Sequence, residues 1–119
     1  MPDTAQTNSA VISSDRVNGT EVYGVEGGSI GHIDHLLIDK KTGRITYAMM
    51  GFGGFMGLGE DYYPIPWAKL DYDPGLAGYR TDITREQIEG APERRDGWYD
   101  DRKWEEATYA HYGAPYYWI

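Results

Sequence analysis

The stretch GHIDHLLIDKKTGRITYAMMG, residues 31–51, decides the fold of this chain. Branched and aromatic apolar residues recur in residues 31–39 and 45–51, and a polar loop, residues 40–44, lies between them. Gly43 can adopt the positive φ that a tight loop often needs. The stretch therefore predicts two antiparallel strands joined as a β-hairpin.

The apolar alternation of the first of these strands slips by one position. Successive side chains of a regular strand point to opposite faces, so Ile33 would face away from Leu36 and Ile38. A β-bulge, which inserts one extra residue, would bring all three to the same face. The sequence predicts this bulge near Asp34 and His35.

Short segments with turn signals between them extend from residue 11 to residue 83. Besides the hairpin, strands are predicted at residues 21–23, 62–66, 69–72 and 79–81. Such a series is typical of a small β-barrel or sandwich, and the 16 glycines favour many turns. We therefore expect a mainly β domain over residues 11–83, preceded by a flexible leader over residues 1–10.

Residues 84–119 are expected to form a helical, aromatic-rich C-terminal extension. Thr84 opens a Thr-Arg-Glu-Gln motif with the spacing of a capping box. Asp100 or Asp101 can cap a second helix that runs through Tyr112, where a Gly-Ala-Pro sequence ends it.

Composition and charge exclude several classes of function. The 19 Asp and Glu outnumber the 11 Lys and Arg, and the formal charge of −8 opposes binding to nucleic acid. The chain has no cysteine, which excludes disulfides and thiolate ligands. A secretory signal and an apolar run of about 20 residues are both missing from the sequence. We expect a soluble cytoplasmic protein without nucleic-acid partners or membrane insertion.

The candidate metal ligands of the sequence are His32, Asp34 and His35. His32 and Asp34 would point to the same face of an extended strand. A structural zinc site usually has four ligands, and this motif offers two with the correct parity. A solvated strand face is the simpler interpretation, and a histidine in a pH-dependent contact is another. A small-ligand or metal-sensing domain is the alternative function.

Motifs of catalysis are missing from the sequence. Its serines do not lie in a Gly-x-Ser-x-Gly elbow, and the glycine-rich residues 51–59 are not followed by the Gly-Lys-Ser/Thr of a nucleotide loop. We therefore expect a protein that is not an enzyme and uses no cofactor.

Two apolar segments are expected to form a contact surface. The glycine-rich loop carries Phe55, Met56 and Leu58. The C-terminal extension carries a larger aromatic group, namely Trp104, Tyr112, Tyr116, Tyr117 and Trp118. Because Tyr and Trp contribute strongly to interfaces, this group is expected to pack back on the domain, to dock on another subunit or partner, or to do both.

Four segments follow one another in a fixed order. They are Gly31-x-Ile33-x-x-Leu36-Leu37-Ile38-Asp39, Thr42-Gly43-Arg44-Ile45, Gly53-Gly54-Phe55-Met56-Gly57-Leu58-Gly59 and Ile65-Pro66-Trp67-x-x-Leu70. Together they resemble the PRC-barrel family, which is named for the H subunit of the photosynthetic reaction centre, and its stand-alone bacterial members in particular. The resemblance implies a small, highly bent antiparallel β-barrel over residues 11–83.

The same resemblance implies a role in protein contact. In the H subunit the barrel supports a membrane electron-transfer complex, and in the ribosome-maturation factor it contacts a ribosomal protein. The family brings no catalytic residues, and this sequence shows neither the membrane helix of the former nor the RNA-associated domain of the latter. We expect a non-catalytic protein-interaction or assembly module that forms a homodimer and has an unidentified protein partner.

Overall fold

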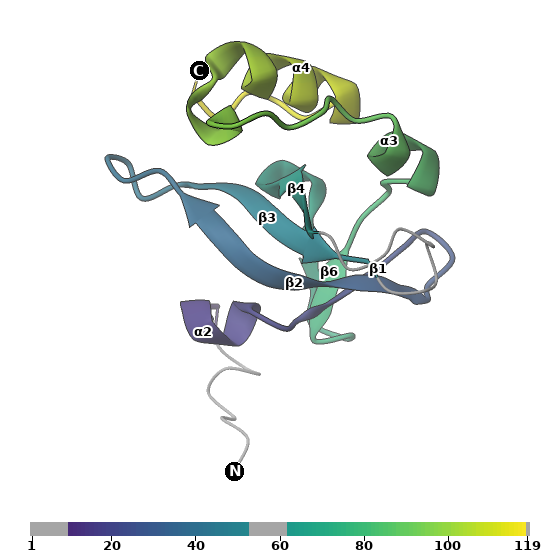
Figure 1. The fold of residues 1–119 in the computed structure, drawn as a ribbon. Coiled ribbons are helices and arrows are strands. Elements are labelled where there is room, and N and C mark those ends of the chain that lie inside the picture. Colours follow the sequence, from purple (N-terminus) through teal and green to yellow (C-terminus); the bar gives the residue numbers. More distant parts are fainter. Residues whose placement is uncertain (1–9, 53–61, 119) are drawn as a thin grey trace.

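The computed structural model describes residues 10–52 and 62–118, and a six-stranded sheet forms its centre (Figure 1). The strands are β1 (Glu21–Tyr23), β2 (Ser29–Ile38), β3 (Ile45–Gly51), β4 (Tyr62–Pro66), β5 (Asp71–Asp73) and β6 (Gly78–Arg80). The helices are α2 (Ser14–Val17), α3 (Arg85–Glu89) and α4 (Arg102–Tyr112), with short 3₁₀ turns η1 (Trp67–Lys69) and η2 (Trp98–Asp100). The predicted leader lies almost wholly outside the described residues.

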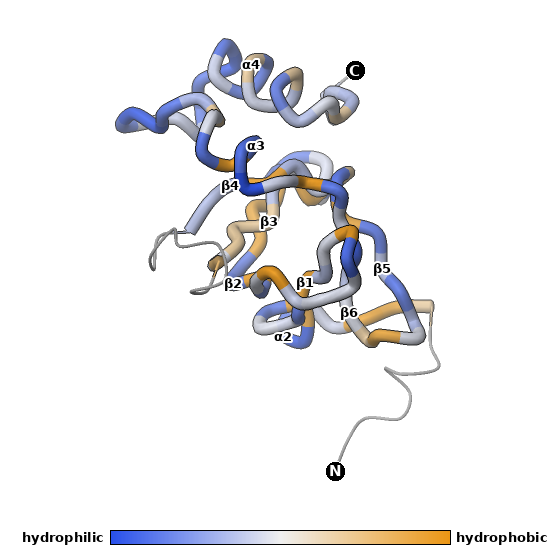
Figure 2. The backbone as a smooth tube through the Cα atoms, turned by 90° about the vertical axis from the view of Figure 1, so that its right-hand side faces the viewer, coloured by the Kyte–Doolittle hydropathy of each residue, from blue (hydrophilic) through white to orange (hydrophobic). Residues whose placement is uncertain are grey.

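The strands follow the order β4-β3-β2-β1-β6-β5 around a curved sheet (Figure 2). Neighbouring strands are antiparallel except for β1 and β6, which are parallel. Among the described residues, no pairing joins the outer strands β4 and β5. The mainly β fold is confirmed, but the expected antiparallel barrel is only partly confirmed because the sheet is not closed.

The chain passes from β4 to β5 through the short 3₁₀ turn η1. The strand predicted at residues 69–72 was wrong at its start, because η1 occupies Trp67–Lys69 and β5 begins only at Asp71. Pro64 and Pro66 have no backbone N–H to donate, which suits β4 to the edge of a sheet. β4 and β5 are the two ends of the strand order, and η1 lies between them along the chain.

The predicted hairpin and its bulge are confirmed. β2 and β3 pair antiparallel, and their register shifts between Ile33 and His35. In the loop, the Asp39 carboxylate accepts hydrogen bonds from the backbone N–H groups of Lys41 and Thr42, at 2.9 and 3.1 Å. Gly43 has a φ of 76°, the left-handed conformation predicted for it.

The expectation that Ile38 shares the core face with Ile33 was wrong. A second register shift lies between Leu37 and Ile38, and Ile38 is 52% exposed. Leu36 packs against the main core, whereas Leu37 packs against the aromatic residues of the C-terminal extension. A single bulge cannot restore the phase over a strand that has two irregularities.

The main core lies where the curved strands meet. Val22, Ile33, Met50 and Ile65 are among its most completely buried side chains. Figure 2 shows the hydrophobic stretches concentrated on the strands, while much of the chain around α4 is hydrophilic. At Gly31 the backbones approach so closely that an added Cβ would lie 2.3 Å from the backbone oxygen of the facing strand, so this position requires glycine.

α3 begins at the predicted capping box, and α4 begins and ends where the sequence predicts. Thr84 forms both hydrogen bonds of the capping box of α3, and the Asp101 carboxylate caps α4 by accepting from the N–H groups of Lys103 and Trp104. Gly113 ends α4 with a φ of 72°. α4 lies over the sheet beside β3 and β4 (Figure 1). Within the described ranges, every helix is too short or too polar to span a bilayer.

Candidate functional site

An aromatic layer joins the C-terminal extension to the sheet. Tyr47 of β3 lies at its centre, with ring centroids 6.0 Å from Trp98, 6.0 Å from Trp104 and 5.4 Å from Tyr109. The Tyr109 hydroxyl donates a hydrogen bond to the backbone oxygen of Thr46. Edge-to-face and tilted ring pairs of this kind are favourable in addition to their burial. The layer therefore fixes α4 on β3.

The last residues of the chain pack around Tyr109. The rings of Tyr116, Tyr117 and Trp118 lie 6.3, 5.6 and 5.4 Å from its ring, and all three are half-buried. The Arg44 guanidinium in the β2–β3 loop donates a 2.7 Å hydrogen bond to the backbone oxygen of Tyr117. The tail thus packs back on its own domain, one of the two arrangements expected from the sequence.

A buried carboxylate completes this attachment. Glu105 is among the buried residues and accepts a 2.7 Å hydrogen bond from the Tyr117 hydroxyl. Arg102 lies 3.6 Å from Glu105 and places its guanidinium 3.9 Å from the ring centre of Trp118. Burial, together with the Glu105 carboxylate, raises the pKa of Tyr117 to about 12. The hydroxyl therefore stays protonated and donating over the whole neutral range.

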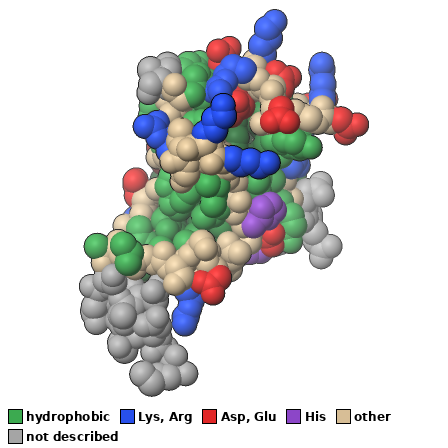
Figure 3. All heavy atoms as spheres, turned by 90° about the vertical axis from the view of Figure 1, so that its left-hand side faces the viewer, with side chains coloured by type: hydrophobic (Ala, Val, Ile, Leu, Met, Phe, Trp, Pro, Cys, Tyr) green, Lys and Arg blue, Asp and Glu red, His purple; other side chains and the backbone are tan. Residues whose placement is uncertain are grey.

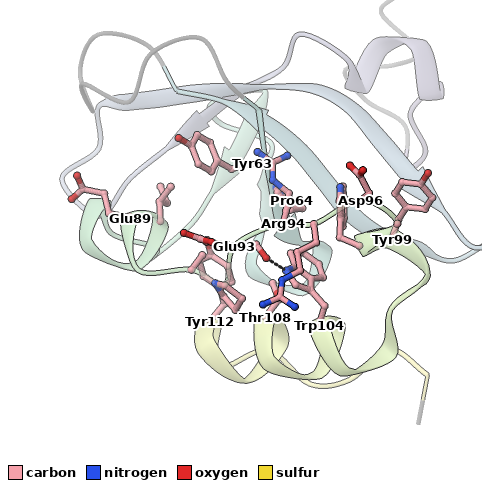
Figure 4. A pocket seen from close by; sticks show the side chains of 16 residues that line it. Tyr63, Pro64, Glu89, Glu93, Arg94, Asp96, Tyr99, Trp104, Thr108 and Tyr112 are labelled. Atoms are coloured by element: carbon pink, nitrogen blue, oxygen red, sulfur yellow. Dashed lines mark hydrogen bonds between the residues drawn. The ribbon is translucent and has the colours of Figure 1, made fainter.

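An open groove of about 970 Å³ lies between β4 and the C-terminal extension (Figure 4). Its aromatic lining comes from Tyr63, Trp98, Tyr99, Trp104 and Tyr112. The segment between α3 and η2 forms its lip and is held by a 2.9 Å hydrogen bond from the Trp104 indole N–H to the backbone oxygen of Glu93. Burial raises the pKa of Tyr112, at the base of the groove, to about 12.

The groove combines aromatic faces with charges of both signs. Arg94 lies within it, with its guanidinium carbon 5.6 Å from the ring centre of Tyr63 and 5.9 Å from that of Trp98. The carboxylates of Glu89, Glu93 and Asp96 and the second guanidinium, Arg95, also line it. These groups can bind a ligand through ring faces, hydrogen bonds and charge.

The structure separates the predicted contact residues into three groups. Tyr112 belongs to the main core and is only 2% exposed, so in this structure it is not at the surface. Trp104 and the three tail residues are half-buried beside the groove and around Tyr109. Phe55, Met56 and Leu58 lie outside the described residues.

The three candidate metal ligands do not form a metal site among the residues that the structure describes. His35 Nδ1 lies 2.7 Å from Asp34 Oδ2, and both side chains are exposed. This contact with His35 lowers the pKa of Asp34. Figure 3 shows histidine beside acidic side chains at the edge of a hydrophobic face. No group of three or more possible ligands, His32 included, comes together in residues 10–52 and 62–118.

Sequence reasoning missed several groove residues. Tyr63 and Arg94 are 31 positions apart in the sequence, and no short motif links them. The wholly charged run over residues 93–96, followed by Gly97 and Trp98, was visible as a change of composition. Its contact with β4 appears only in the tertiary structure, because it depends on how α3 and α4 pack.

Comparisons with known proteins agree with the sheet architecture. A family model described as the PRC-barrel domain matches residues 10–88. A Deinococcus radiodurans protein described as uncharacterized is 32% identical over 77 residues, which are 65% of this chain and 27% of that protein. The chain therefore spans about a quarter of the length of this relative.

A solved structure offers a more distant comparison. It is described as a 16S ribosomal RNA processing protein, RimM, from Pseudomonas aeruginosa, and it has a TM-score of 0.42 and 17% identity over 72% of this chain and 50% of that chain. The family model alone covers well over half of the sequence. Together with the strand order and the β2–β3 hairpin, this family match shows that the chain belongs to the PRC-barrel domain family.

Proposed function

We propose that this protein is a non-catalytic protein-interaction or assembly module whose C-terminal extension provides the contact surface. The observation that carries the proposal is the half-buried aromatic group of Tyr116, Tyr117 and Trp118, which Arg44 holds in place. This group belongs to the same aromatic cluster as Trp98 and Trp104, which line the groove. Rigid aromatic side chains that are already positioned lose little entropy on binding. They are therefore suited to contact with a partner.

The proposal includes a homodimer and a cytoplasmic location. An isologous dimer would place the same extension of two copies together, and the formal charge of −8 favours protein partners over nucleic acid. Phe55, Met56 and Leu58 remain in the proposal as a second contact, because three apolar side chains on a glycine-rich loop suit an interface.

Affinity capture from the native host, with identification by mass spectrometry, tests the module. The test variant is Tyr116→Ala with Trp118→Ala, and the matched control is Tyr72→Ala, which removes an exposed tyrosine from the distant strand β5. We expect a partner that the wild type and the control capture and the tail variant loses, and that binds again as a purified protein. Equal capture by all three would refute the role of the tail.

Sedimentation velocity over a range of protein concentrations tests the homodimer. We expect a concentration-dependent shift from monomer to dimer, which the tail variant weakens and Tyr72→Ala leaves unchanged. A Phe55→Ser, Met56→Ser, Leu58→Ser variant tests the loop in the same way. A monomer at all concentrations would refute the dimer, and circular dichroism confirms that each variant is folded.

A further inference from the structure

Arg94 occupies an unusual position in the groove. Its guanidinium faces two aromatic rings, Tyr63 from β4 and Trp98 from η2. Within the described part of the chain it makes no hydrogen bond or ion pair, although the carboxylates of Glu93 and Asp96 line the same groove. Arg94 is itself exposed. The ring faces thus hold a cationic group that has no ion-pair partner among residues 10–52 and 62–118.

Among the described lining residues, acidic side chains outnumber basic ones, and their excess grows when Arg94 leaves the groove. Glu89, Glu93 and Asp96 line the groove against Arg94 and Arg95. Glu89 is already paired with Arg85 at 3.5 Å, so with the Arg94 side chain turned out to solvent the described lining would offer Glu93 and Asp96 against Arg95, beside two uncovered ring faces. This arrangement attracts a cation, as does the formal charge of −8 on the whole chain.

A buried hydroxyl group also lies beside the groove. Thr108 of α4 lines the groove and is 1% exposed. Its Oγ1 has no hydrogen-bond partner in the described residues. Buried polar atoms are usually paired, and a hydroxyl oxygen can accept a hydrogen bond from a guanidinium N–H group.

We propose that this groove binds an arginine side chain from an exposed basic segment of a partner protein, which displaces Arg94 from the faces of Tyr63 and Trp98. The inference rests on the proposed function and names the chemistry of the partner. Most of the lining lies beyond residue 88, where the family match ends. The site is therefore built mostly by the C-terminal extension, while Tyr63 of the matched domain contributes one of its two rings.

Titration calorimetry at about physiological ionic strength tests this inference with a capped five-residue peptide of alternating glycine and arginine. Matched peptides carry citrulline, the neutral analogue, or glutamate in place of arginine. We expect the arginine peptide to bind and the other two to bind at least about tenfold more weakly, since both lack the cation. Equal binding of the citrulline peptide, or no binding of the arginine peptide up to about 1 mM, would overturn the inference.

Variants at Arg94 decide between attraction of a cation and attraction of an anion. Arg94→Ala removes the internal competitor, and we expect the arginine peptide to bind about two- to fivefold more tightly, which corresponds to one exposed cation–π contact. Arg94→Glu should tighten binding of the arginine peptide further. If Arg94 itself bound an acidic partner, both variants would instead abolish binding of the glutamate peptide and leave the arginine peptide unaffected, and the inference would be wrong.

Variants of aromatic residues inside and outside the groove test whether the arginine peptide binds in the groove. Tyr63→Leu should weaken binding of the arginine peptide several-fold. Tyr72→Leu, which replaces an exposed tyrosine outside the groove, should leave this binding unchanged. Equal affinity in these two variants would mean general attraction to an acidic protein, which refutes the site. If Tyr63→Leu fails to fold, the exposed Arg94 variants still decide the question.

Tail-dependent capture of a partner without peptide binding would refute only this inference, whereas peptide binding without such capture would refute only the proposed contact role of the tail.

Discussion

The hydrogen bond from Tyr109 to Thr46 can be tested by replacing Tyr109 with phenylalanine. The Tyr109 ring is 1% exposed, and its hydroxyl is the group that ties α4 to the backbone of β3. Phenylalanine keeps the ring contacts with Tyr47 and the tail but removes the donor. The substitution therefore isolates the contribution of one buried hydrogen bond.

The expected loss follows from the burial of both partners. A typical hydrogen bond contributes about 1 kcal/mol, and a buried acceptor that loses its donor adds to the cost, so we expect a loss of about 1 to 2 kcal/mol in the free energy of unfolding. For 119 residues, each 1 kcal/mol corresponds to a fall of about 4 °C in Tm.

Urea denaturation followed by tryptophan fluorescence measures this loss, because Trp98 and Trp104 lie in the same aromatic layer. Tyr99→Phe is the matched control: Tyr99 is 60% exposed, so removing its hydroxyl should change stability by less than about 0.5 kcal/mol. If the two variants were equally stable, the Tyr109 hydroxyl would not fix the helix on the sheet and the reasoning would be refuted.

Three further predictions concern a helix cap, a close backbone approach and pH. Thr84→Ala should cost about 1 kcal/mol in denaturant unfolding because α3 loses its capping box, and Thr84→Ser should restore most of it; an unchanged Thr84→Ala would count against the cap. Gly31→Ala should cost about 1 to 3 kcal/mol or more, since its Cβ would collide with the backbone of β3. Gly28→Ala, with open space around the added Cβ, should be nearly neutral, and equal losses would contradict the steric argument. Burial and the hydrogen bond to Glu105 raise the pKa of Tyr117 to about 12, so the folded state binds this proton more tightly than the unfolded chain. The resulting stability is complete below about pH 10 and is lost between about pH 10 and 12; Tyr117→Phe should flatten the measured fall in stability over this range, and an unchanged slope would refute the assignment.

Several features of the fold could be predicted from the sequence because they depend on neighbouring residues. The loop of the hairpin needs a positive φ at Gly43, the cap of α4 needs the Asp101 carboxylate, and its end needs Gly113. The bulge near Asp34 and His35 follows from the slipped apolar alternation. Each of these signals lies within a few residues, where backbone sterics and local hydrogen bonds dominate.

The closure of the sheet and the face of Ile38 could not be predicted in this way. The second register shift of β2 depends on its pairing with β3. Among the described residues β4 and β5 do not pair, and the alternation of apolar residues indicates neither this nor the η1 turn between them. Strand pairing and packing between distant segments decide such features, and tertiary context often outweighs local preference.

Some features of the candidate site could likewise be predicted from the sequence, and others appear only in the tertiary structure. The sequence by itself determined the aromatic content of the extension, its helix, the acidic charge and the family of the domain. Only the tertiary structure decided that Tyr112 is core, that the tail packs on Tyr109, and that Tyr63 and Trp98 face Arg94. Local chemistry fixes which side chains are available, whereas the packing of α3 and α4 against the sheet fixes which of them meet, because those contacts join segments far apart in the chain.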